Sequence, residues 1–248
     1  MSALDWLTAR PVAHRGLHDG AAGVIENTAS AFTAAIAANY AIECDLQLAA
    51  DGEAMVHHDD ALERLTEGTG ALASLTAAEL KQIPLRATSD RMLTVGELCD
   101  LVAGRATLVI ELKSQFDGDL RLAARAADVL SHYAGPAALM SFDPALIAAL
   151  RALAPELPRG IVAERNYSHH EWKGLSARTK RALACFQHAL KSRPQFIAYS
   201  VKDLPAPVPR LARHVFRLPV LTWTVRTDVD RARAARYADQ MIFEGFRP

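Results

Sequence analysis

Hydrophobic residues in this chain fall into short runs rich in Val and Ile, and these runs alternate with longer alanine-rich segments. The runs have strand length, while the segments between them have helical periodicity, so the pattern predicts repeated βα units around a parallel sheet. Strands are predicted over residues 10–14, 41–48, 107–113, 137–142, 159–163, 195–200, 219–225 and 240–244. Eight such units close a barrel, and we predict an α/β fold of the TIM (β/α)8 type.

Capping residues mark several helix starts between the predicted strands. An aspartate followed by a proline, at positions 143 and 144, predicts a helix over 144–153. Two Thr-x-x-Glu capping boxes predict helices that begin after positions 76 and 94, and a final periodic segment predicts a helix over 228–237.

One connection is too long for an ordinary loop. Residues 59–93 contain turn residues and one short helix, and we predict that they form a small insertion between the second and third βα units. With no internal repeat, low-complexity tract or linker in the sequence, residues 1–248 are predicted to form a single domain. Residues 2–8 are expected to cover the mouth of the barrel opposite the site.

Composition narrows the possible partners. Half of the 248 residues are apolar, which is enough for a large core. The 28 basic residues balance 28 acidic ones, so the protein has no net charge that would attract nucleic acid or an anionic membrane. The three cysteines are too few and too scattered for a disulfide framework or a zinc motif. Because we find neither a signal peptide nor an apolar run of roughly 18 to 20 residues, we expect a soluble, cytoplasmic protein without stable membrane insertion.

Acidic residues interrupt two of the apolar strands. Glu43 and Asp45 alternate along the second strand and so face the same side, within a segment that otherwise looks buried. This fragment alone leaves open whether they are solvated acids of an edge strand or metal ligands. Glu111 lies near the carboxyl end of the third strand, with Lys113 on the same face. Three carboxylates would form an all-oxygen site, which favours a divalent cation such as Mg²⁺ or Ca²⁺ over Zn²⁺.

Two histidines lie where strands give way to loops. His14 ends the first strand, and His58 ends an extended segment after the second. Phosphodiester cleavage needs a general base and a general acid, and imidazole suits both roles near neutral pH. Arg15 supplies a planar donor pair for phosphate oxygens. A single histidine at a strand end is more often structural, so the catalytic interpretation depends on the neighbouring acids.

Together these residues resemble the glycerophosphodiester phosphodiesterase family. Its blocks HRG, ENT, ExD, HD and ExK occur in order at residues 14–16, 26–28, 43–45, 58–59 and 111–113, followed by WTV at 223–225. The resemblance implies a barrel enzyme that hydrolyses a small-molecule glycerophosphodiester to sn-glycerol 3-phosphate and an alcohol. The attacking group would be either the substrate's neighbouring hydroxyl, which gives a cyclic phosphate that water then opens, or water itself.

The resemblance also implies a role for each site residue. The general acid and base are His14 and His58, the ligands of the divalent cation are Glu43, Asp45 and Glu111, and the phosphate contacts are Arg15 and Lys113. Trp223 is a candidate for the pocket wall. The family histidine directly precedes an aspartate, which selects His58, and strand alternation then turns His57 to the other face.

Other interpretations remain open at this point. A phospholipase D-like or lysophospholipid-acting relative would share the barrel, and a non-catalytic phosphodiester-binding homologue would be expected to lack one of the site residues.

Residues 165–193 form a basic stretch after the fifth strand, which we expect to be a solvated helix rather than a cover of the site. The C-terminal FEGFRP differs from the family's usual Thr-Asp ending. We expect this difference to alter the pocket wall but to leave the metal and histidine groups untouched. The oligomeric state is not predicted.

Overall fold

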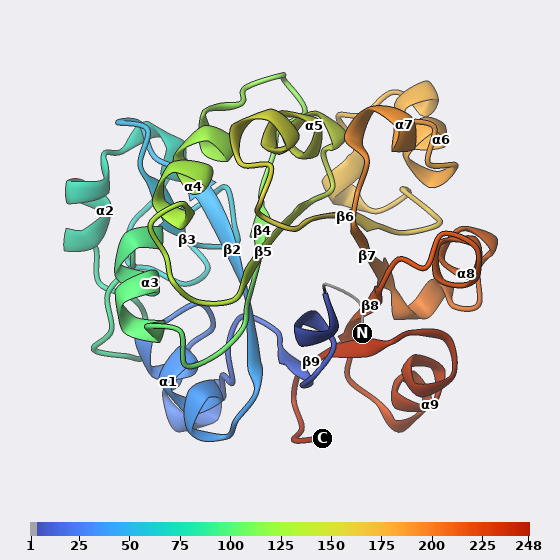
Figure 1. Cartoon of the computed structure of the whole chain (residues 1–248). Helices are drawn as coiled ribbons and strands as arrows, with labels where there is room; N and C mark the ends of the chain where they lie inside the picture. Colours follow the sequence, from blue (N-terminus) through green and yellow to red (C-terminus); the bar gives the residue numbers. More distant parts are fainter. Residues whose placement is uncertain (1–3) are drawn as a thin grey trace.

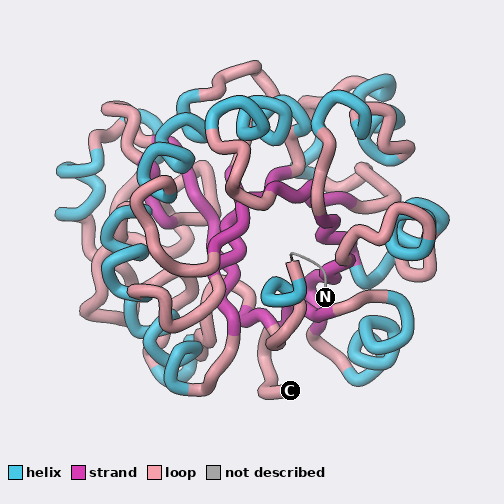
Figure 2. The backbone as a smooth tube through the Cα atoms, in the orientation of Figure 1, coloured by secondary structure: helices cyan, strands magenta, loops and turns pink. Residues whose placement is uncertain are grey.

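A ring of eight parallel strands forms the centre of the protein, as the computed structural model shows for residues 4–248. The ring closes because β1 pairs with both β2 and β9 (Figures 1 and 2). Its strands are β1 Val12–Ala13, β2 Ala41–Leu48, β4 Leu108–Leu112, β5 Ala137–Ser141, β6 Arg159–Ala163, β7 Phe196–Ser200, β8 Val220–Val225 and β9 Gln240–Phe243. The eight predicted strands and the TIM barrel are confirmed.

Helices surround the ring of strands (Figure 2). They are α1 Ala29–Ala37, α2 Ala77–Gln82, α3 Val95–Val102, α4 Arg121–Leu130, α5 Pro144–Leu153, α6 Ala177–Ala184, α7 Ala189–Ser192, α8 Pro207–His214 and α9 Asp228–Tyr237. The capping signals gave the right starts: the Asp143 side chain accepts the Ala145 N–H before α5, and both predicted capping boxes form before α2 and α3. No helix in residues 4–248 is long and apolar enough to cross a membrane.

Residues between β2 and α3 form a small unit on the side of the barrel. It starts with an extra strand, β3 (Ala54–Val56), which runs antiparallel to β2, and it includes α2 and the 3-10 helix Leu72–Ser74. Its own apolar cluster consists of Ala49, Met55, Leu62, Leu72, Leu80 and Met92. The sequence indicated an extended segment here, but the pairing of β3 with β2 was not predicted, because three residues carry no register information.

An apolar layer fills the barrel from its amino-terminal mouth. The 3-10 helix η1 (Asp5–Leu7) lies over this mouth, in the middle of the ring in Figure 2, and its Leu7 is completely buried. Leu7 packs with strand residues such as Val12 and Val109. The predicted cover is therefore present over its described part, while residues 2 and 3 lie outside the described residues. Because this mouth is filled, the barrel interior is open toward the carboxyl ends of the strands.

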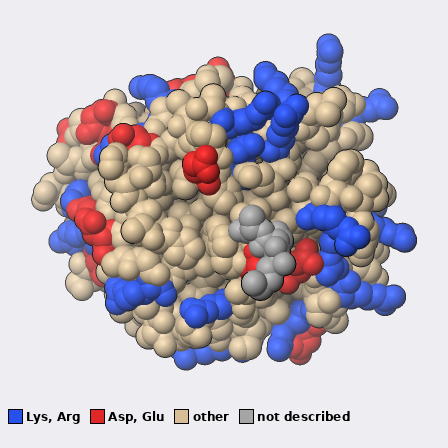
Figure 3. All heavy atoms as spheres, in the orientation of Figure 1, with Lys and Arg blue, Asp and Glu red and all other residues tan. Residues whose placement is uncertain are grey.

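Charges of both signs occur on the face seen in Figure 3, and many of the Lys and Arg side chains lie on the right of this view, where α6 to α9 lie. The zero formal net charge comes from equal numbers of basic and acidic residues, 28 of each, which are not evenly spread over this face.

Candidate active site

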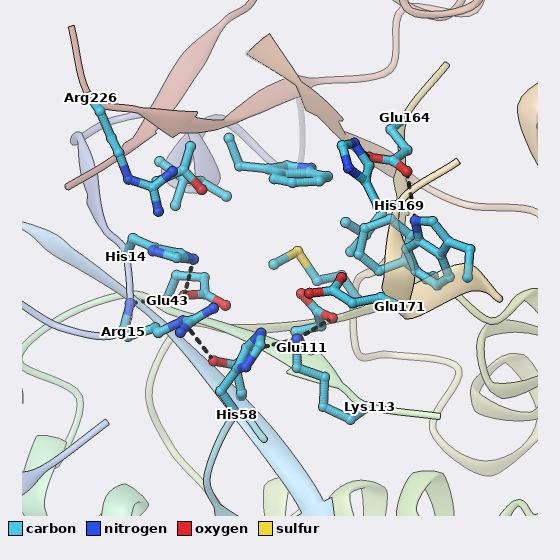
Figure 4. Close-up of a pocket in the computed structure, with 18 residues that line it drawn as sticks. His14, Arg15, Glu43, His58, Glu111, Lys113, Glu164, His169, Glu171 and Arg226 are labelled. Atoms are coloured by element: carbon cyan, nitrogen blue, oxygen red, sulfur yellow. Dashed lines mark hydrogen bonds and ion pairs between the residues drawn. The ribbon is translucent and has the colours of Figure 1, made fainter. Parts of the chain in front are cut away.

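A cavity of about 250 Å³ opens at the carboxyl ends of the strands, the end at which barrel enzymes bind their substrates (Figure 4). Its floor is apolar and includes Met140, Val162 and Ile242, which belong to the barrel layer described above. Its walls contain every residue that the sequence singled out: His14, Arg15, Glu43, Asp45, His58, Glu111, Lys113 and Trp223. The barrel therefore brings together residues that are far apart in the chain.

Three carboxylates meet on one side of this cavity. Glu43 and Asp45 alternate along β2, and Asp45 is paired in register with Glu111 on β4. One oxygen from each of the three lies within 4.8 Å of the others, and the residues are 1 %, 1 % and 8 % exposed. Buried acids at this spacing fit a divalent cation, and oxygen ligands favour a hard one. This group could hold a metal ion.

Cations of the protein already balance part of this negative charge. Lys113 Nζ lies 2.8 Å from Asp45 Oδ1 and 2.8 Å from Glu111 Oε1. Burial alone would raise the pKa of Asp45, but Lys113 and Arg15 overcome this effect and hold it well below its usual range. The pKa of Glu43 is instead raised by burial and by the neighbouring carboxylates of Asp45 and Glu111. A bound divalent cation would favour the ionised form of Glu43.

The ENT block holds this cluster in place. The Arg15 guanidinium donates to Glu26 Oε1 at 2.6 Å, and its Nε lies 3.3 Å from Asp45 Oδ2. The side-chain amide of Asn27 donates to the same Asp45 oxygen at 2.9 Å, and Thr28 is the N-cap of α1. Each residue of the block therefore holds a different part of the site: Glu26 holds the Arg15 guanidinium, Asn27 holds the Asp45 carboxylate, and Thr28 caps α1.

His14 is held by a carboxylate from the far end of the chain. Glu244 Oε2 accepts a hydrogen bond from His14 Nδ1 at 2.6 Å, and Arg226 donates to both oxygens of Glu244. Burial lowers the pKa of His14 to about 4 despite this partner. The expectation that the C-terminal ending leaves the histidines untouched is therefore wrong: β9 pairs with β1, so the residue after Phe243 lies beside His14.

His58 is held by its own neighbour in sequence. Its Nδ1 lies 2.7 Å from Asp59 Oδ1, and Arg64 joins Asp59 to Glu26 through hydrogen bonds to both carboxylates. His58 lines the cavity, whereas His57 is 2 % exposed and lies outside the lining. This placement agrees with the strand alternation from which His58 was selected.

The sequence model of the glycerophosphoryl diester phosphodiesterase family matches residues 14–246, nearly the whole chain. The chain belongs to this family. The matched region includes both histidine–carboxylate pairs and the three clustered acids.

Individual members of the glycerophosphoryl diester phosphodiesterase family show how far the likeness extends. A glycerophosphodiester phosphodiesterase of Caldanaerobacter subterraneus is 34% identical over 111 residues, 42% of this chain and 44% of that protein. The Bacillus subtilis protein YhdW is 27% identical over 160 residues, 60% of this chain and 65% of its own length. The matches thus span less than two thirds of the length of these curated relatives.

A solved structure with the same fold is an Oleispira antarctica phosphodiesterase in complex with the product sn-glycerol-3-phosphate. It has a TM-score of 0.75 and 22% identity, and the likeness covers 96% of this chain and 94% of that one. At this identity the comparison supports the barrel fold alone.

The cavity of this family member has a further wall that the sequence did not reveal. Figure 4 shows Glu164, His169 and Glu171 on the side opposite His14, Arg15 and Arg226. Trp172 lies on the same wall as Glu164, which accepts its indole N–H at 2.6 Å. The basic stretch 165–193 was expected to be a solvated helix, but it contributes directly to the cavity, and within it α6 is partly exposed and buries Leu183. In the sequence, this contribution was indicated only by the position of residues 165–193 after the fifth predicted strand, because loops at that end of a barrel lie near the active site.

Proposed function

We propose that the protein is a metal-dependent phosphodiesterase that hydrolyses glycerophosphodiesters to sn-glycerol 3-phosphate and an alcohol. The observation that carries this proposal is that three clustered carboxylates and two carboxylate-held histidines line one cavity. Membership of the glycerophosphoryl diester phosphodiesterase family supports the same reaction.

The two histidines supply the proton transfers. Because a carboxylate engages Nδ1 of each ring, Nε2 is the atom left to exchange a proton with the substrate. His14 is neutral at pH 7, since burial lowers its pKa to about 4, and this form can accept a proton from the attacking hydroxyl or water. His58 then donates a proton to the leaving oxygen. If a cyclic phosphate forms, the two histidines exchange roles when water opens it.

Glu43, Asp45 and Glu111 are the proposed ligands of a Mg²⁺ or Ca²⁺ ion. When bound, such an ion neutralises charge on the phosphate oxygens. Arg15 and Lys113 are proposed to bind the phosphate directly: both line the cavity, and burial among acids keeps their cationic heads close to the carboxylate cluster. Trp223 is proposed to pack against the organic part of the substrate.

The test is turnover of defined substrates by the purified protein. Glycerophosphocholine, glycerophosphoethanolamine, glycerophosphoinositol and lysophospholipids would be incubated with and without chelator, and release of glycerol 3-phosphate or of the lipid product would be measured. We expect chelator-sensitive release of glycerol 3-phosphate from the water-soluble diesters, restored by Mg²⁺ or Ca²⁺. Chelator-insensitive turnover would refute the metal site, and exclusive turnover of lysophospholipids would favour the lipid-acting alternative.

A further inference from the structure

The two sides of the cavity differ in how their acids are balanced. On the catalytic side, Asp45 and Glu111 lie within 2.8 Å of the Lys113 ammonium. On the side of Glu164, His169 and Glu171, across the cavity from His14 and Arg226 in Figure 4, no lysine or arginine in the described part of the chain forms an ion pair with Glu164 or Glu171. The second side is therefore acidic without a resident cation.

Glu164 is the most buried of the acidic side chains on this side of the cavity that have no lysine or arginine partner among the described residues. It follows β6, is only 6 % exposed, and its polar contacts are the Trp172 indole N–H at 2.6 Å and His169 Nε2 at 3.9 Å. Burial, together with the nearby Asp203 and Glu171 carboxylates, raises the pKa of Glu164. A buried carboxylate with so little compensation is stabilised by any cation that enters the cavity.

Aromatic rings form the rest of this wall. The ring of Phe142 lies 4.7 Å from that of Trp172 and 5.6 Å from that of Trp223, centroid to centroid. Both indoles are fixed by their N–H groups, which donate to Glu164 and to the Ala198 carbonyl. Indole faces attract ammonium groups, and quaternary ammonium ligands are commonly bound by such groups of rings. The rings and the acids therefore favour the same kind of ligand.

We propose that this wall is a subsite for a cationic head group, so that the protein prefers glycerophosphodiesters of ammonium alcohols, such as choline and ethanolamine, over those of neutral alcohols. The inference rests on the proposed phosphodiesterase function, because it assigns the alcohol end of a diester held in the same cavity. Glycerol is the weaker candidate for this wall, since a neutral polyol gains little from a ring face and cannot balance the acids.

A matched pair of substrates tests the subsite. Glycerophosphocholine and its 3,3-dimethylbutyl isostere have the same shape and differ in the positive charge of the head group. We expect kcat/KM to be about 10-fold higher for the choline diester, a ratio typical of cation–π and carboxylate contacts. Equal values of kcat/KM would overturn the subsite while leaving the phosphodiesterase function intact.

Charge-removing variants locate the effect. Glu171→Gln, at an exposed position, and Glu164→Gln, at a buried one, should each bring the choline-to-isostere ratio toward one. Glu156→Gln is the matched control, because Glu156 is exposed and lies in the loop before β6, away from the cavity lining. A ratio unchanged by both cavity variants would overturn the assignment.

Binding of tetramethylammonium separates the subsite from catalysis. Trp172 and Trp223 line the cavity, so titration with this cation at constant ionic strength should give a saturable change in tryptophan fluorescence. The change should weaken in Glu171→Gln but persist in Glu156→Gln. If no diester is cleaved, the phosphodiesterase proposal fails and this titration alone judges the subsite. A titration indistinguishable from one with sodium chloride would overturn it.

Discussion

His14 and His58 face the same cavity but depend on different parts of the fold. The side chain of His14 is 12% exposed, and its partner Glu244 lies 230 positions away in the chain. The side chain of His58 is 23% exposed, and its partner is the next residue, Asp59. Both rings have a carboxylate on Nδ1, so the same local chemistry is reached by a long-range contact in one case and by a local one in the other.

This difference shows which histidine depends on closure of the barrel. The Glu244 carboxylate reaches His14 only because β9 pairs with β1, the contact that completes the ring. Asp59 needs no such contact, since it follows His58 directly. The geometry of His14 should therefore be the more sensitive to changes at the end of the chain, whereas that of His58 should depend on the β2–β3 hairpin.

Removal of either ring should have the largest effect on turnover. His14→Ala and His58→Ala should each lower kcat by about 10² to 10⁴, the usual contribution of a general acid or base. His57→Ala, the adjacent control, should keep most activity because His57 lies outside the cavity lining. Steady-state kinetics on a glycerophosphodiester would measure this. Greater loss in His57→Ala than in His58→Ala would show that the assignment of the second histidine is wrong.

The carboxylate partners should separate the two histidines. We expect Glu244→Gln to lower kcat about 10- to 100-fold, as is typical when a carboxylate that orients a histidine is lost. Asp59→Asn should cost less, since water can reach the more exposed His58 ring. Because Glu244→Gln removes a negative charge beside the His14 imidazole, it should also lower the pKa of His14, the proposed general base, and the acidic limb of the pH–rate profile should move to lower pH.

Arg226→Gln is the control for Glu244→Gln, because it removes the other hydrogen-bond partner of Glu244 and leaves the Glu244–His14 contact. It should shift the profile less than Glu244→Gln does. If Asp59→Asn costs as much as Glu244→Gln, burial of the ring does not determine how much a histidine depends on its partner.

Features encoded locally were predictable, and those made by distant contacts were not. Alternation along one strand was enough to place Glu43 and Asp45 together, and the family blocks led to His14 and His58. Glu244 was missed because its contact with His14 exists only after the first and last strands pair. Glu164 was missed because a single acid after a strand has no pattern around it, and its importance comes from the packing of Trp172.

Burial of His14 should make the metal-free protein sensitive to acid. Its pKa falls from 6.5 to about 4 on folding, so as the pH drops through this window the unfolded chain takes up a proton that the folded one excludes. Stability present above pH 6.5 is thus lost toward pH 4, by about 2 kcal/mol at pH 5. Urea unfolding at pH 7.5 and pH 5 would show this loss in the wild type and a smaller one in His14→Gln.

The comparison of the wild type with His14→Gln also controls for another partly buried histidine, His188. Burial also lowers the pKa of His188 to about 4, but this residue is present in both proteins, so its contribution cancels in the difference between them. Equal losses in the wild type and His14→Gln would mean that the His14 ring is not the source of the acid sensitivity.

The smallest effect is expected from Arg64, which connects the surroundings of both histidines. Its side chain is 47% exposed and donates to Glu26, the partner of Arg15, and to Asp59, the partner of His58. Exposed ion pairs contribute at most about 1 kcal/mol, so Arg64→Gln should lower kcat/KM by less than about 5-fold, and the difference should shrink at high salt. Arg91→Gln is the matched control, since Arg91 lies in the same insertion and donates only to backbone carbonyls. If Arg64→Gln lowered kcat/KM as much as Asp59→Asn, the Asp59 carboxylate would need Arg64 to hold its position. The pairing of His58 with Asp59 would then depend on a contact made by folding, as the pairing of His14 with Glu244 does. The contrast between the two histidines would disappear.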